Sequence, residues 1–234
     1  MELRVVLYSE GHAESGGEDS SLPPPGAPLD PGHLGAAHLL VERCLLSKLV
    51  GQDVAVRFLS PLRLPDDARI PRGSDLLKRK TVRRLVASFG RGLDPDLVVV
   101  LVDTDGDTQR RTLLVRFIDE PPVKHLLRSI VGAAQQAFEA WLLGDPKAAD
   151  EIAGEAVSAT EHPETLSPDE AKQSLATILT LARRRTPDGL SSDLAARRKL
   201  ATIVRLEDLR RQRSFEEFSK ECASEASRLA RAAG

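Results

Sequence analysis

Residues 96–107 read DLVVVLVDTDGD, and this stretch decides the fold class. An unbroken apolar run, residues 97–102, lies between Pro95 and Asp103. The run has the length of an ordinary strand and is too short for a typical helix. Apolar residues without alternation are typical of a strand covered on both faces, as the central strands of parallel sheets are. The stretch therefore predicts the central strand of a parallel sheet, followed by an acidic turn.

Three further strands are expected on either side of this one in the chain. They are residues 3–8 (LRVVLY), 53–59 (DVAVRFL) and 126–134 (LLRSIVGAA). Helical spacing of apolar residues predicts helices over 33–50, 73–89, 107–118 and 135–143. Because strands and helices alternate, the sequence predicts βαβ units and an α/β fold with a mainly parallel, four-stranded sheet.

Two segments differ from this pattern. Residues 15–32 are rich in Gly, Ser and Pro, and we expect a flexible loop there because the segment has little apolar surface to bury. Beyond Thr160 only helices are expected, over 167–185, 194–213 and 214–232. We therefore expect an α/β core over 1–160 and a C-terminal helical appendage over 161–234.

The overall composition limits the functional classes. The formal net charge of the 234 residues is -2, so no global positive field favours nucleic acid, and any such contact must come from a local patch. Cys44 and Cys222 show neither a disulfide framework nor zinc-ligand spacing. No apolar run is long enough to cross a bilayer, and no secretion signal opens the chain. We expect a cytoplasmic protein without a membrane partner.

Acidic residues follow the predicted strands in three clusters. These clusters are Glu10/Glu14, Asp103/Asp105/Asp107 and Glu139/Asp145. The carboxyl ends of parallel strands meet at one edge of a sheet, where neighbouring carboxylates repel one another unless a hard cation neutralises them. If strand geometry persists beyond Asp103, residues 103 and 105 face the same side. An ordinary Asp-Gly turn or a helix cap remains the alternative for the second cluster, and a solvated turn for the first.

Three segments carry a resemblance to a known superfamily. VVLYSEGHAE (5–14), DLVVVLVDTDGD (96–107) and AFEAWLLGD (137–145) resemble the Toprim-like superfamily shared by topoisomerases, primases and OLD-family nucleases. More narrowly, they resemble an uncharacterised bacterial family of Toprim-like proteins, and LEDLRRQRSFEEF (206–218) is also similar to the end of that family. FEAWLL is the most specific of these matches.

The resemblance implies a Toprim-like, Rossmann-type core and roles for particular residues. Glu10 would act as general acid/base or metal ligand, and Asp103 and Asp105 would bind Mg²⁺ or Mn²⁺. By similarity to the OLD-family nucleases, Glu14, Glu139 and Asp145 would complete a second metal site, so that one or two ions assist the attack of water on a phosphodiester. The chain has no Gly-rich phosphate loop ending in Lys-Ser or Lys-Thr, so a separate ATPase subunit is the expected partner.

A basic helix supplies one more candidate. Lys80 lies in the run from Lys78 to Arg84 and could stabilise the charge of a pentavalent phosphate, although such a run is also typical of a solvated helix face. The first hypothesis is a Mg²⁺- or Mn²⁺-dependent nuclease within a bacterial anti-phage defence module. DNA is the favoured substrate, and RNA is the alternative. The alternatives are a catalytically silent Toprim-fold scaffold that binds an ATPase partner or nucleic acid, and a nucleotidyl transferase. The oligomeric state stays open, a homo-oligomer included.

Overall fold

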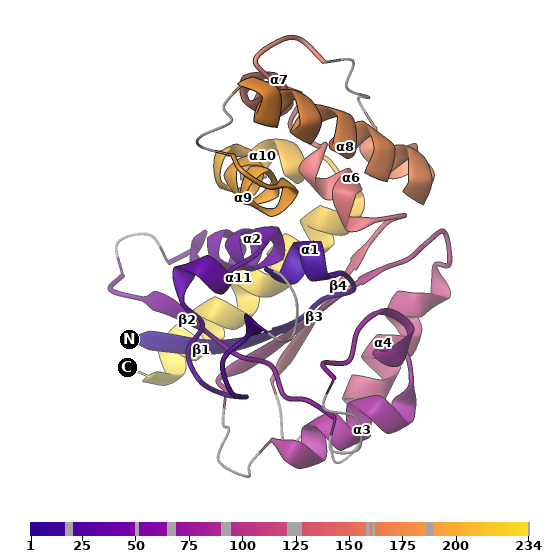
Figure 1. The fold of residues 1–234 in the computed structure, drawn as a ribbon. Coiled ribbons are helices and arrows are strands. Elements are labelled where there is room, and N and C mark those ends of the chain that lie inside the picture. Colours follow the sequence, from indigo (N-terminus) through magenta and orange to yellow (C-terminus); the bar gives the residue numbers. More distant parts are fainter. Residues whose placement is uncertain are drawn as a thin grey trace.

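A parallel sheet of four strands forms the centre of the protein (Figure 1). The structure is a computed structural model and describes residues 1–16, 21–49, 52–64, 69–89, 95–120, 128–157, 160, 162–185 and 190–233. The strands are β1 (Glu2–Tyr8), β2 (Ala55–Leu59), β3 (Leu97–Asp103) and β4 (Ser129–Ala134), in the order β2-β1-β3-β4. All three pairings are parallel. The predicted α/β fold class is thereby confirmed.

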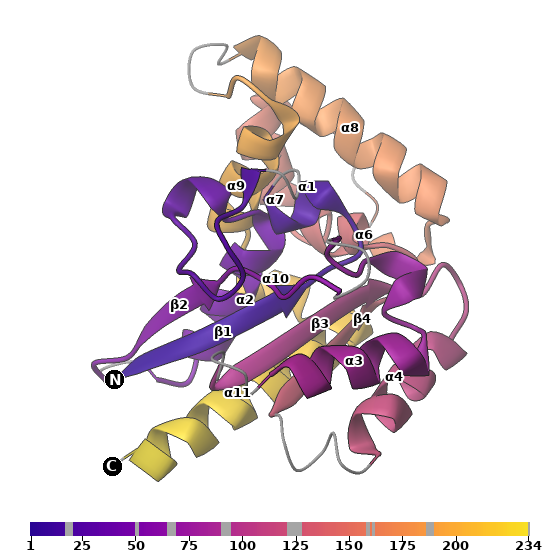
Figure 2. The ribbon, with the colours of Figure 1, turned by 60° about the horizontal axis from the view of Figure 1, so that its bottom comes forward.

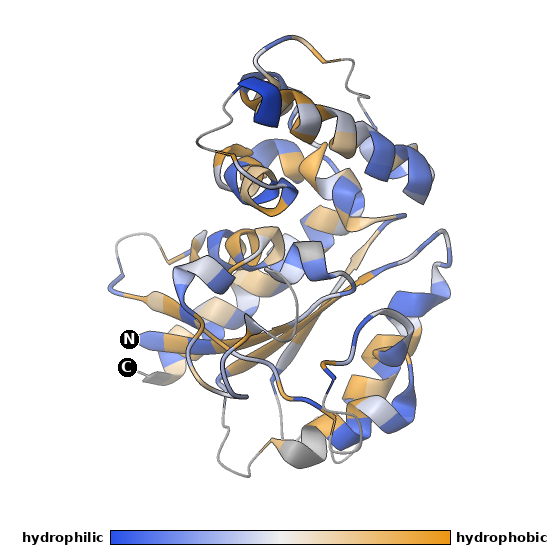
Figure 3. Ribbon diagram, in the orientation of Figure 1, coloured by the Kyte–Doolittle hydropathy of each residue, from blue (hydrophilic) through white to orange (hydrophobic). Residues whose placement is uncertain are grey.

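Helices cover both faces of the sheet, which explains the uninterrupted apolar run in β3. On one face lie α2 (Ala36–Leu46) and α11 (Arg213–Ala233), and on the other lie α3 (Arg79–Ser88) and α4 (Gln109–Asp119) (Figure 2). Val99 and Leu101 belong to the core on the α2 side, whereas Val98 and Val100 belong to the core on the α3 side. Both faces of β3 are therefore covered, and all seven of its residues are buried. Figure 3 shows the strands as largely hydrophobic segments.

The other helices of the described residues lie outside these two layers, several of them on the far side of α2 from the sheet (Figure 1). They are α1 (His12–Ser15), α6 (Phe138–Leu142), α7 (Pro146–Ala153), α8 (Pro168–Arg185), α9 (Asp193–Ile203) and α10 (Leu206–Leu209), with the 3-10 helices η2 (Pro31–His33), η3 (Gly73–Asp75) and η4 (Pro163–Thr165). Within the described part of the chain, no helix combines the length and the apolar character needed to cross a bilayer.

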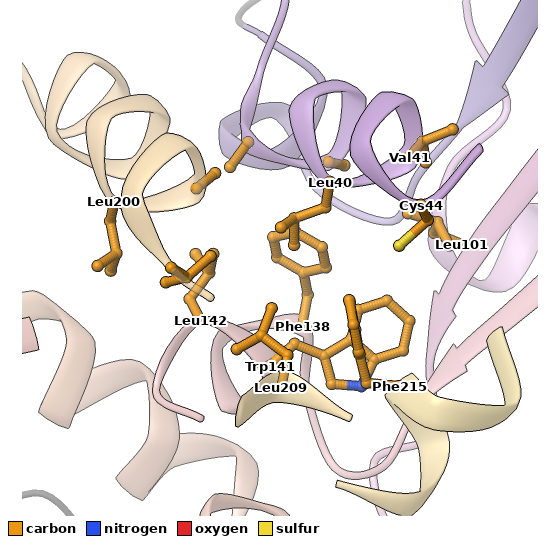
Figure 4. Close-up of a cluster of buried hydrophobic side chains, with 14 of the residues drawn as sticks. Leu40, Val41, Cys44, Leu101, Phe138, Trp141, Leu142, Leu200, Leu209 and Phe215 are labelled. Atoms are coloured by element: carbon orange, nitrogen blue, oxygen red, sulfur yellow. The ribbon is translucent and has the colours of Figure 1, made fainter. Parts of the chain in front are cut away.

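The C-terminal helices share the core of the sheet. Phe215 of α11 packs against Trp141 of α6, with ring centroids 5.2 Å apart (Figure 4). Phe218 of α11 stacks on the same indole at 5.3 Å, and the Trp141 indole N–H donates to Ser214 Oγ at 2.7 Å. A Cβ atom on Gly132 of β4 would lie 2.9 Å from Phe218, so α11 approaches the strand closely. Helix α11, which belongs to the expected appendage, is therefore one of the layers that cover the sheet.

Two other expectations differ from the structure. The helix predicted over 194–213 is interrupted after α9, because the backbone N–H of Arg205 donates to the carboxylate of Asp145 and not to the helix. In the loop predicted over 15–32, Gly26 and Leu29 donate backbone hydrogen bonds to Ser60 and Phe58, so this part lies along the edge of β2. Residues 17–20 of that loop lie outside the described residues.

Candidate metal centre

Three buried carboxylates meet beyond the carboxyl ends of β1 and β3. One oxygen each of Glu14, Asp103 and Glu139 lies within 4.8 Å of the others, a spacing that could hold a metal ion. The three residues are 6%, 5% and 5% exposed. They come from α1, the last position of β3 and α6, which converge at this end of the sheet (Figure 2). The structure thus brings together one residue from each of the three acidic clusters seen in the sequence.

Close backbone contacts fix the position of Glu14. The Glu14 side chain turns back and accepts a hydrogen bond from the Gly11 N–H at 3.1 Å, which caps the short helix α1. On the other side of α1, a Cβ atom on Gly35 would lie only 2.1 Å from the Glu14 carbonyl oxygen. Only glycine permits this approach, so the turn before α2 holds Glu14 in place.

Asp103 connects the cluster to Glu10. Its Oδ1 accepts a hydrogen bond from the Phe138 N–H at 2.7 Å, at the start of α6. Its own backbone N–H donates to Glu10 Oε2 at 2.7 Å. The Glu10 side chain is 24% exposed, so Glu10 lies between the buried cluster and the solvent. Glu10 is therefore a neighbour of the cluster and not one of its three members.

Glu139 is incompletely satisfied. Its Oε1 accepts a hydrogen bond from Arg197 Nη1 of α9 at 3.0 Å, in a pair that is almost fully buried. Its Oε2 is buried and has no hydrogen-bond partner within the described part of the chain. A buried carboxylate oxygen without a partner is costly, by about 1–3 kcal/mol or more for a charged group. A cation at the centre of the cluster would supply the missing partner.

Burial and mutual repulsion shift the protonation of the cluster. Burial, followed by the charges of Glu14, Glu10 and Glu139, raises the pKa of Asp103 to about 8. Burial and the charge of Glu139 raise the pKa of Glu14 to about 7. Burial also raises the pKa of Glu10. Without a cation the centre therefore holds protons near neutral pH, and an ion of two positive charges would replace them.

Asp105 does not belong to the cluster, although the sequence predicted it as a metal ligand. Strand geometry ends at Asp103, and Asp105 lies in a turn with φ 46°, held there by its N–H bond to the Gln136 carbonyl. Its carboxylate points to Arg110, whose Nη1 lies 2.6 Å from Asp105 Oδ2. The prediction that residues 103 and 105 face the same side is therefore wrong, because the left-handed backbone conformation of Asp105 turns the chain.

Asp145 and Lys80 also lie elsewhere. Asp145 is fully buried at the N-terminus of α7, where it accepts hydrogen bonds from Lys147 and Ala148 and pairs with Arg205 through both oxygens. Burial by itself raises the pKa of Asp145, but the hydrogen bonds from Arg205 outweigh it and hold the pKa at about 2. Its oxygens are thus engaged, which corrects the expectation of a metal ligand. Lys80 is exposed on α3, on the opposite face of the sheet from α2.

Sequence reasoning missed two cations of the site, Arg110 and Arg197. Both lie beside another arginine on their helix, and nothing in the local pattern separates them from surface residues. Folding brings α4 and α9 beside the acidic residues, and the sequence alone does not show this proximity.

Comparisons with known proteins give no assignment for this site. No protein-family model, no curated protein and no solved structure matches this chain.

Proposed function

We propose that the protein is a Mg²⁺- or Mn²⁺-dependent nuclease of the Toprim type that hydrolyses phosphodiester bonds of nucleic acid. One observation carries the proposal, the buried cluster of Glu14, Asp103 and Glu139, in which Glu139 Oε2 has no hydrogen-bond partner among the described residues. Carboxylate oxygens are the ligands that Mg²⁺ and Mn²⁺ prefer, and neither histidine nor cysteine belongs to this set. The location beyond the strand ends is where α/β sheets bind ligands.

The residues divide into two roles. Glu14, Asp103 and Glu139 would hold the ion, which when bound would polarise a phosphoryl oxygen and lower the pKa of a bound water. Glu10 would accept the proton of the attacking water through Oε1, since Oε2 is held by the Asp103 N–H. The raised pKa of Glu10 suits this role, because a general base works best with a pKa near the working pH.

A catalytically silent scaffold is the second candidate, and a specific observation favours it. Two of the acidic residues already have a cationic partner within the chain, since Arg197 binds Glu139 and Arg110 binds Asp105. Such pairs lower the need for a metal. In this alternative the fold would bind an ATPase partner or nucleic acid without cutting it. An ATPase subunit is a proposed partner in both candidates. For the nuclease, we also propose a role in anti-phage defence.

The test is a nicking assay with supercoiled plasmid in Mg²⁺ or Mn²⁺. We expect nicking by the wild-type protein, its loss with a chelator, and a decrease of about 10²- to 10⁴-fold for Glu10→Gln. Glu2→Gln is the matched control, because Glu2 lies at the first position of β1, at the opposite end of the strand from Glu10, and its exposed carboxylate pairs with Arg57. The control should nick at the wild-type rate.

Two results would count against the nuclease. Equal nicking by the wild type and Glu10→Gln would assign the activity to a contaminant. A protein that neither binds Mn²⁺ nor nicks plasmid would favour the silent scaffold.

A further inference from the structure

A guanidinium group occupies the outer rim of the carboxylate site. Arg110, in the first turn of α4, places Nη1 2.6 Å from Asp105 Oδ2 and 4.0 Å from Glu10 Oε1. The same nitrogen donates to the Asp103 carbonyl oxygen at 3.0 Å. The Arg110 side chain is 24% exposed, unlike the buried cluster beneath it. Arg110 therefore lies between Glu10 and Asp105, on the solvent side of the site.

The surrounding turn fixes this position. Asp105 has φ 46° and Gly106 has φ 79°, so the chain reverses after β3 and brings α4 back over the strand end. The Thr104 N–H donates to the Ala134 carbonyl and the Gln136 N–H donates to Thr104 Oγ1. The turn is thus tied to the end of β4, and the two oxygens that Arg110 binds belong to this turn.

Arg110 keeps donors for another anion. Both of its hydrogen bonds within the described part of the chain are made by Nη1. A guanidinium has five N–H donors in a planar fork, and this fork matches the two free oxygens of a phosphodiester. The group is also always charged, so its charge does not depend on metal concentration or on pH.

We propose that Arg110 takes the place of a second metal ion and contacts the scissile phosphate directly. The centre would then bind one divalent ion, through Glu14, Asp103 and Glu139. The inference rests on the proposed function and deepens it. A second divalent ion between Glu10 and Asp105 would have to displace the guanidinium, because two cations cannot share that position. The carboxylates of Glu10 and Asp105 would serve to hold Arg110 and to face the attacking water.

The number of bound Mn²⁺ ions tests the inference without reference to activity. Mn²⁺ is titrated to millimolar concentration and counted by electron paramagnetic resonance and calorimetry. We expect one ion for the wild type and two for Arg110→Gln, since the variant removes the guanidinium that pairs with Asp105 and lies beside Glu10. Arg110→Lys keeps the charge and should bind one ion. Arg111→Gln is the matched control, because Arg111 neighbours Arg110 on α4 but pairs with Glu221 of α11.

The nicking assay supplies the second readout. At Mn²⁺ concentrations that fill only the first site, Arg110→Gln should lower the rate on the order of a hundredfold, while Arg111→Gln leaves it unchanged. Circular dichroism of each variant checks that the fold persists.

The outcomes separate this inference from the proposed function. Two ions on the wild type, or one ion on both the wild type and Arg110→Gln, would overturn the role of Arg110 alone. No Mn²⁺ on any protein would remove the metal centre itself, and with it the proposed nuclease.

Discussion

The free energy of unfolding of the metal-free protein is expected to fall as the pH rises from about 5 to about 8. Asp103 and Glu14 have pKa values of about 8 and about 7 in the folded protein, above the ordinary values of such carboxyl groups. Between the ordinary and the raised values, the folded state binds protons that the unfolded state has lost. Stability is therefore greatest below the ordinary values and is lost as the pH rises through the raised ones.

The expected loss is on the order of 3–5 kcal/mol, because each pKa unit corresponds to about 1.4 kcal/mol and the two groups interact. Asp103→Asn should remove most of the fall and should make the metal-free protein more stable at pH 8. The replacement keeps an oxygen to accept the Phe138 N–H bond. Urea unfolding in a chelator at several pH values measures this. Asp53→Asn, at an exposed position before β2, is the control.

Mn²⁺ should reverse this pH dependence. Ligand carboxylates must lose their protons to bind a cation, so stabilisation by Mn²⁺ should increase between pH 6 and 8. It should be absent in Asp103→Asn. A metal-free wild type that is as stable at pH 8 as at pH 5 would contradict the assigned burial and repulsion in the cluster.

Asp145→Ala is expected to lower the free energy of unfolding by about 3 kcal/mol. Asp145 caps α7 through two backbone N–H groups and pairs with Arg205 at the start of α10. The change removes the cap and leaves Arg205 without this partner. The Arg205 side chain is 40% exposed, so we place the loss at the lower end for a buried ion pair. Glu151→Ala, at an exposed position on α7, should have little effect.

The same position distinguishes a structural role from metal binding. Asp145→Asn keeps the oxygen that caps α7 but loses the charge that Arg205 binds. We expect a smaller loss of stability than for Asp145→Ala and an unchanged affinity for Mn²⁺. A weakened affinity in a variant that is still folded would restore Asp145 as a metal ligand.

The elements that could be predicted from the sequence are those whose pattern depends on local burial. The run at residues 97–102 is apolar throughout because both faces of β3 are covered, and the sequence alone shows this. The break between α9 and α10 was not predictable, since it depends on the bond from Arg205 to Asp145, 60 residues away. Nor does the sequence show that Phe218 of α11 packs against Gly132 of β4.

In the candidate site, too, some features could be predicted from the sequence, whereas others depend on contacts made only in the folded chain. Glu14, Asp103 and Glu139 are three of the six metal ligands predicted. Their clusters could be placed because parallel strands bring their carboxyl ends to one edge of a sheet, whereas the metal-binding role of Glu14 and Glu139 was implied by the resemblance to OLD-family nucleases. The direction of Asp105 depends on the turn at Asp105-Gly106, which the sequence offered only as the alternative to continued strand geometry. Arg110 contacts the site only because that turn folds α4 back over the strand.

Diffraction from crystals soaked in Mn²⁺ tests the central claim most directly. Anomalous scattering should show one ion in contact with the carboxylates of Glu14, Asp103 and Glu139, with the Arg110 guanidinium still bound to Asp105. An absence of anomalous density among these three carboxylates at saturating Mn²⁺ would contradict the metal centre.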